Sequence, residues 1–141
     1  MITLYQCLQE ESAAILAAAK RLKNDEVEKT LILLEECYEN KKKLVLTGVG
    51  KSGIVARKLA ATFTSIGLTS IYLNPLDALH GDLGIVDVND LCVLISNSGE
   101  THELIQLIPH LKNKGCIQIG ILGNLNSNLA YQSDISLDAS V

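Results

Sequence analysis

The sequence contains no Trp, and aromatic residues make up only 4% of its 141 residues. Aliphatic side chains and alanine must therefore form the core, as in buried parallel strands covered by Ala-rich helices. The four cysteines stand singly, without the close spacing of a zinc site or of a disulfide scaffold. We expect reduced cysteines, no metal and no cofactor.

An excess of positive charge is also absent, because the formal net charge is −4. The only basic cluster, residues 41–43, is interpreted as a solvated helix end, so we expect no nucleic-acid partner. No apolar run approaches membrane-spanning length, and residues 1–11 lack the basic and apolar regions of a signal peptide. The sequence predicts a cytoplasmic protein without membrane contact.

The length favours a single domain over 1–141, with a helical arm over about 1–40 and an α/β core over about 41–141. Apolar residues recur at helical spacing across 3–39, apart from a break at Asn24-Asp25. Either Asn24 or Asp25 can cap the second helix of the arm.

From residue 44 onward, short apolar runs alternate with helical segments. Strands are predicted over 44–46, 70–73, 91–95 and 117–121, with a weaker one over 135–137. Helices are expected over 52–66, 76–80, 100–113 and 126–131. This alternation predicts an α/β three-layer sandwich with a five-stranded parallel sheet of flavodoxin-like order 2-1-3-4-5. Ligands of such sheets bind beyond the carboxyl ends of strands 1 and 3.

The loop after the first strand, residues 48–53, reads Gly-Val-Gly-Lys-Ser-Gly and fits a dinucleotide fingerprint. The acidic residue that such a site needs at the end of the second strand is missing, so this is a minority interpretation. A P-loop is rejected because Val45 replaces its leading glycine. The remaining interpretation is a glycine turn in which Gly50 lets the backbone approach a ligand, Lys51 faces it, and Ser52 begins a helix that favours an anion.

The loop after the third strand places three hydroxyls close together, at Ser96, Ser98 and Thr101, with Asn97 and Gly99 between them. Hydroxyls and exposed N–H groups can surround a phosphate monoester without arginine. An ordinary helix cap by Ser98 is the alternative, but one serine would suffice for that. The pattern therefore favours phosphate binding.

Two further residues could act in proton transfer. Glu103 lies in the first turn of the helix after this loop, where a carboxylate also suits the helix dipole. His80 lies in a connection broken by Pro75 and Gly81, and a structural role and a catalytic role are equally compatible with that position. His102 and His110 are interpreted as surface residues.

Three stretches together, 48–63, 74–86 and 95–100, resemble the sugar isomerase (SIS) domain of the arabinose-5-phosphate isomerases of the KpsF/GutQ group. The resemblance covers nearly the whole chain. It implies interconversion of arabinose 5-phosphate and ribulose 5-phosphate through an enediol(ate), feeding Kdo and lipopolysaccharide synthesis. It also implies that Ser96, Ser98 and Thr101 hold the phosphate, and that Lys51, His80 and Glu103 form the catalytic centre.

The family pattern continues beyond the last residues of this chain with a helix, an acidic residue, a histidine and usually two CBS domains. We therefore expect a C-terminally truncated SIS domain without CBS domains, whose fifth strand exposes apolar surface that invites self-association. A homodimer or homotetramer is expected. Two other hypotheses are a non-catalytic sugar-phosphate-binding regulatory module and, with less support, a nucleotide-cofactor enzyme.

Overall fold

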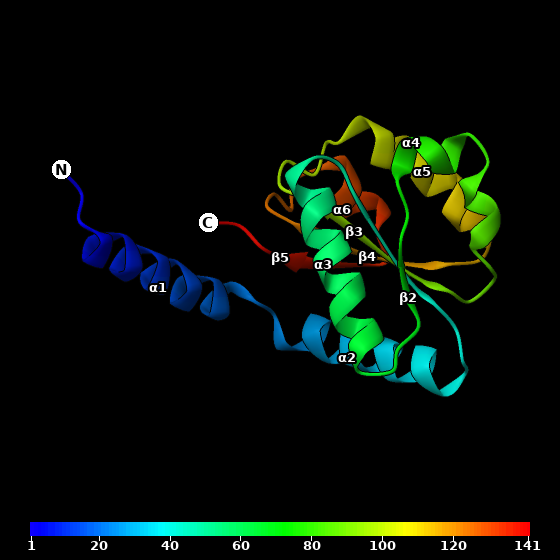
Figure 1. The fold of residues 1–141 in the computed structure, drawn as a ribbon, viewed down its shortest axis with the longest axis horizontal. Helices are drawn as coiled ribbons and strands as arrows, with labels where there is room; N and C mark the ends of the chain where they lie inside the picture. The colour runs from blue at the N-terminus through cyan, green and yellow to red at the C-terminus, as the bar shows by residue number, and fades with distance from the viewer.

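The computed structural model describes residues 1–141 and contains one parallel five-stranded sheet of order β2-β1-β3-β4-β5 (Figure 1). This is the strand order that the sequence predicts. The neighbouring strands β1 and β3 pair from Leu44↔Leu91 to Gly48↔Ile95, so their carboxyl ends lie side by side. The strands are β1 (Leu44–Gly48), β2 (Ser70–Tyr72), β3 (Leu91–Ser96), β4 (Ile117–Leu122) and β5 (Ile135–Asp138).

Helices cover both faces of the sheet and complete the three layers. One face packs against α2 (Asn24–Glu39) and α3 (Lys51–Ser65). The other packs against α4 (Pro75–Leu79), the 3-10 turn η1 (Asp82–Ile85), α5 (His102–Asn113) and α6 (Asn128–Gln132). The interior strands β1 and β3 are buried along their full length because both faces are covered.

The helix α1 (Leu4–Arg21) extends away from this body (Figure 1) and has no buried residue. Thr3 starts it with a capping box, in which its side chain and that of Gln6 each accept a bond from the other's backbone. The guanidinium of Arg21 contacts Asp138 and donates to the Ser140 carbonyl, which joins the end of α1 to the end of β5. None of the helices is long and apolar enough to cross a membrane.

Neither candidate for the cap of α2 was correct. Lys23 occupies the cap position without a side-chain hydrogen bond, and Asn24 is already the first helical residue. The buried thiol of Cys37 near the end of α2 belongs to the core, so only α1 leaves the body.

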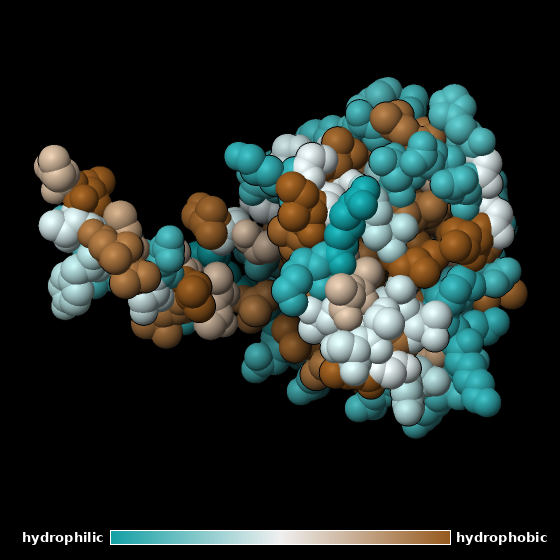
Figure 2. All heavy atoms as spheres, in the orientation of Figure 1, coloured by the Kyte–Doolittle hydropathy of each residue, from teal (hydrophilic) through white to brown (hydrophobic).

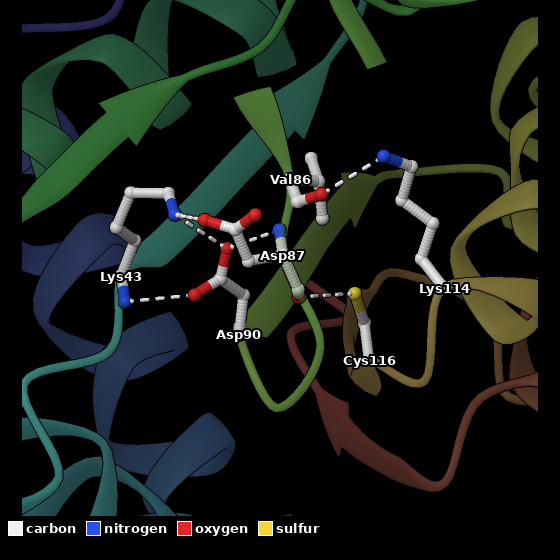
Figure 3. Close-up of polar contacts among 6 residues, drawn as sticks. All are labelled: Lys43, Val86, Asp87, Asp90, Lys114 and Cys116. Atoms are coloured by element: carbon white, nitrogen blue, oxygen red, sulfur yellow. Dashed lines mark hydrogen bonds and ion pairs between the residues drawn. The ribbon is translucent and has the colours of Figure 1, made fainter. Parts of the chain in front are cut away.

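The interpretation of residues 41–43 as a solvated helix end was wrong for Lys43 (Figure 3). Its Nζ lies 2.7 Å from Asp87 Oδ2 and 2.9 Å from the fully buried Asp90 Oδ2. Partial burial opposes the charge of Lys43, but the hydrogen bonds to both carboxylates outweigh it and raise the pKa of the ammonium. Asp90 also accepts from the backbone N–H groups of Lys43 and Asp87, so this cluster joins the starts of β1 and β3.

The expected apolar surface on the fifth strand is also absent. Ile135 is 7% exposed and Leu137 is half-buried, and both pack into the core beneath α2. Exposed apolar side chains gather instead on α1, at Leu4, Tyr5, Leu8, Ile15 and Leu16 (Figure 2).

Candidate ligand site at the carboxyl ends of the strands

The turn between β1 and α3 depends on three glycines. Gly50 has a φ of 60° and a ψ of −126°, a conformation that residues with a Cβ rarely adopt. A Cβ on Gly53 would lie 2.8 Å from the Gly48 carbonyl oxygen, and a Cβ on Gly48 would lie equally close to the backbone of Ser52. The turn is therefore folded tightly on itself and leaves Lys51 exposed at its tip.

The loop between β3 and α5 brings two of its three hydroxyls into contact. Ser96 Oγ and Thr101 Oγ1 are 2.7 Å apart, and Ser96 Oγ also accepts from the Gly99 N–H at 3.0 Å. Ser98 Oγ is exposed and accepts only from the Glu100 N–H at 3.1 Å. Gly99 adopts a φ of 69°, so the loop curls back over the end of β3.

The two helices that follow these loops begin without a side-chain cap. Gly50 caps α3 and Thr101 caps α5, in each case with no side chain accepting from the first turn. The alternative that Ser98 caps α5 is therefore not what the structure shows. By contrast, side chains cap α1, α4 and α6. The N–H groups that begin α3 and α5 remain available to an anion.

A hollow of about 150 Å³ lies where these loops meet. Ser52 lines it from the first loop, and Ser96 and Asn97 line it from the second. Its remaining walls are Ile95, Ile121, Gly123 and Ala139. Three of the predicted residues, Ser52, Ser96 and Asn97, thus line one hollow, because the carboxyl ends of adjacent parallel strands lie side by side. The other predicted binding residues, Gly50, Ser98, Gly99 and Thr101, do not line it.

A third loop, between β4 and α6, closes over the second, and the sequence interpretation missed it. The Glu100 carboxylate accepts from the Asn128 backbone N–H at 2.8 Å and from its side-chain amide at 2.6 Å. These bonds lower the pKa of Glu100, the side-chain bond having the larger effect. A Cβ on Gly99 would overlap Ser127, so the two loops also pack closely. The run 123–128 follows a predicted strand and is rich in asparagine, and this pattern could have indicated a third loop at the site.

The three predicted catalytic residues form no hydrogen bond or ion pair with one another. Lys51 is exposed and has no carboxylate partner, His80 is exposed at the end of α4, and Glu103 is half-buried in the first turn of α5. No hydrogen bond or ion pair joins them, and none lines the hollow beside Ser96. His102 and His110 are exposed, as predicted. No three His, Cys, Asp or Glu side chains are grouped as a metal site requires.

Residues 38–141 match the family model described as the SIS domain. The chain is 44% identical over 133 residues to the arabinose 5-phosphate isomerase KpsF of Escherichia coli, covering 94% of this chain and 40% of that protein. The chain thus spans less than half the length of this curated relative.

Two solved structures are similar over nearly the whole chain. A candidate sugar-phosphate isomerase from Listeria monocytogenes superposes with a TM-score of 0.91 at 38% identity, covering 98% of this chain and 71% of that one. A protein of Escherichia coli, solved in complex with a sugar phosphate, superposes with a TM-score of 0.79 at 36% identity. That match covers 99% of this chain and 76% of the other.

Proposed function

The chain belongs to the SIS domain family, and on that basis we propose that it is an aldose–ketose isomerase domain acting on arabinose 5-phosphate. The product is ribulose 5-phosphate. The relatives support the sugar-phosphate isomerase class, and the residues of this chain supply the chemistry proposed below.

The hydroxyl cluster at the end of β3 carries the proposal. Ser96, Ser98 and Thr101 bind the phosphate, and Ser52 lines the same hollow as Ser96. Gly50, Asn97 and Gly99 give the phosphate access to backbone N–H groups. The uncapped starts of α3 and α5 favour the negative charge, so no arginine is needed.

The reaction moves one proton from C2 to C1 and a second from O2 to O1. After ring opening, a base removes the proton from C2, the electron pair forms the enediolate, and negative charge develops on O1. The ammonium of Lys51 stabilises that charge. His80 and Glu103 divide the remaining steps, in which C1 and O1 gain protons and O2 loses one, so that the carbonyl group moves to C2.

One observation favours a second candidate function, a non-catalytic sugar-phosphate-binding module with a regulatory role. Lys51, His80 and Glu103 make no hydrogen bond or ion pair with one another, whereas Ser96 contacts Thr101 and lines one hollow with Ser52 and Asn97. A domain that binds the phosphate without assembling the catalytic groups would hold the sugar and release it unchanged.

Incubation with arabinose 5-phosphate tests both functions. We expect ribulose 5-phosphate to form, and we expect Lys51→Gln to slow turnover by about 10²-fold or more while calorimetry still shows binding. Lys58→Gln, on the same helix but away from the turn, is the matched control and should change neither quantity. Binding without turnover would favour the regulatory module, and the absence of both would overturn the proposal.

The proposal also covers the cellular compartment and the oligomeric state of the protein. We place the protein in the cytoplasm, where its product feeds Kdo and lipopolysaccharide synthesis, and its free cysteines suit a reducing compartment. We further propose a homodimer or homotetramer held by α1. Leu8 is 56% exposed and Ile15 is 71% exposed on one stripe of that helix, and a second copy would cover them.

A further inference from the structure

A hollow of about 540 Å³ lies beside the end of β2, outside the loops assigned to the phosphate. Arg57 of α3 and Tyr72 of β2 form one wall, and residues 73–85 supply the others. The guanidinium carbon of Arg57 lies 4.3 Å from the centre of the Tyr72 ring. No carboxylate pairs with Arg57, so the Tyr72 ring is the partner that the structure shows for its guanidinium.

The hydroxyl of Tyr72 points from this wall into the glycine turn. It donates to the Gly48 carbonyl oxygen at 2.9 Å. That oxygen is the last acceptor of β1, directly before the turn that carries Lys51 and Ser52. Tyr72, on the edge strand β2, thus forms a hydrogen bond at the glycine turn, which lies beyond the end of the sheet.

Backbone pairing cannot supply this hydrogen bond. The last ladder bond between β1 and β2 runs from the Leu73 N–H to the Leu46 carbonyl at 2.9 Å. In a parallel ladder the next donor for Gly48 is two residues further along, at position 75. That residue is Pro75, which has no N–H. The Tyr72 hydroxyl replaces the missing donor.

The same hydroxyl also packs against the far end of the turn. A Cβ on Gly53 would lie 3.0 Å from Tyr72 Oη and 2.8 Å from the Gly48 oxygen. Tyr72 Oη therefore bonds to one end of the turn, at Gly48, and lies close to the other, at Gly53. The tip between them, with Gly50 at positive φ and Lys51 exposed, has no side-chain hydrogen bond of its own.

We propose that Tyr72 is a positioning residue that clamps the Gly48–Gly53 turn, and that Arg57 keeps its ring in place from the side of the hollow. The clamp fixes the start of α3, and with it Lys51 and Ser52, before a ligand arrives. Preorganisation of this kind lowers the ordering cost that binding would otherwise bear. The roles of Lys51 and Ser52 rest on the proposed function, whereas the clamp itself does not.

Tyr72→Phe removes the hydroxyl and keeps the ring, and Tyr38→Phe is the matched control at an exposed tyrosine whose hydroxyl makes no hydrogen bond. Amide hydrogen exchange in the full chain without ligand reports the clamp directly. The most informative amide is that of Ile54, which donates to the Gly50 carbonyl at 3.2 Å. In Tyr72→Phe we expect its exchange to accelerate at least about threefold, with β4 amides unchanged, because only the turn is released.

Two measurements complete the test: calorimetry with arabinose 5-phosphate gives the affinity, and an assay of ribulose 5-phosphate formation gives kcat and KM. We expect Tyr72→Phe to weaken binding about tenfold, the effect of one hydrogen bond, with kcat falling more than KM rises. Arg57→Lys keeps the charge but loses the planar stacking, and it should accelerate Ile54 exchange by a smaller factor.

Unchanged Ile54 exchange in a folded Tyr72→Phe variant would overturn the clamp, and unchanged exchange in Arg57→Lys would remove Arg57 from it. If the wild-type chain binds no arabinose 5-phosphate, the proposed function fails while the exchange result still decides the clamp.

Discussion

Ser96 is the most constrained residue of the proposed phosphate site. It is 2% exposed in all, and its hydroxyl both contacts Thr101 Oγ1 and accepts from the Gly99 N–H. A hydroxyl held in this way contributes to the shape of the loop, and with Thr101 as the donor between the two hydroxyls it can still donate a hydrogen bond to a phosphate oxygen. Ser98 is exposed and has no partner beyond a backbone N–H, so its hydroxyl is free to turn toward a ligand.

The double substitution Ser96→Ala with Ser98→Ala should lower the affinity for arabinose 5-phosphate by about 100-fold or more, because two hydrogen bonds to a charged group are lost. Isothermal titration calorimetry measures the affinity, and circular dichroism checks that the fold is retained. Ser65→Ala, at the far end of α3, is the control and should bind normally. An affinity equal to that of the wild type would show that the phosphate lies elsewhere.

At the scale of the elements, side-chain hydrogen bonds join the loop after β3 to the loop before α6, and we call this junction the latch. Glu100 after β3 accepts two hydrogen bonds from Asn128 at the start of α6. Because these bonds lower the folded-state pKa of Glu100, the latch stabilises the protein above the ordinary pKa of 4.5 and is lost as pH falls through the lowered value.

Thermal melting as a function of pH tests this latch. Near neutral pH we expect Glu100→Gln to melt below the wild type, because the charge that strengthens both bonds is gone. The difference should shrink as the pH falls through the lowered pKa of Glu100, where the wild-type carboxylate is itself protonated. Glu28→Gln, at an exposed glutamate without a partner, should follow the wild type at every pH. A difference that does not depend on pH would contradict the latch.

The starts of β1 and β3 are joined by the cluster of Lys43, Asp87 and Asp90, and this cluster allows an independent prediction. Asp90→Asn leaves Lys43 partly buried without its buried counter-charge, so the free energy of unfolding should fall by about 3 kcal/mol in urea titrations. Asp87→Asn should cost much less, because Asp87 is exposed. Neither change should alter sugar-phosphate affinity, since the cluster lies at the starts of β1 and β3. A large loss of affinity would mean that the two ends are coupled.

At the scale of the whole molecule, α1 is the feature that the isolated chain leaves unexplained. An 18-residue helix with no buried residue is marginal by itself in water, so packing on another copy is the expected source of its stability. The exposed stripe at Leu8 and Ile15 is the surface for that packing in our proposal.

Leu8→Glu with Ile15→Glu should convert the oligomer to a monomer, because two buried charges oppose the association. Ala13→Glu with Ala17→Glu adds the same charge on the opposite side of the helix and should leave the oligomer intact. Light scattering coupled to size-exclusion chromatography gives both masses. A monomeric wild type would refute the homo-oligomer, and dissociation in both variants would attribute the effect to charge alone.

Local sequence patterns were enough to predict the architecture and the place where the two loops meet. Short apolar runs and the helical segments between them are features of neighbouring residues, and the pairing order then follows from general rules for parallel sheets. Because β1 and β3 are neighbours in that order, Ser52 and Ser96 had to meet at one edge, and the family resemblance was carried by the same loops.

The partners of individual polar side chains could be known only from the folded chain. Lys43 was assigned to solvent because its carboxylate partners lie 44 and 47 residues away in the sequence. The pairs Glu100–Asn128 and Tyr72–Gly48 were missed for the same reason. Secondary structure follows from neighbours along the chain, whereas hydrogen bonds between loops depend on where distant segments come to lie, and no local pattern encodes that position.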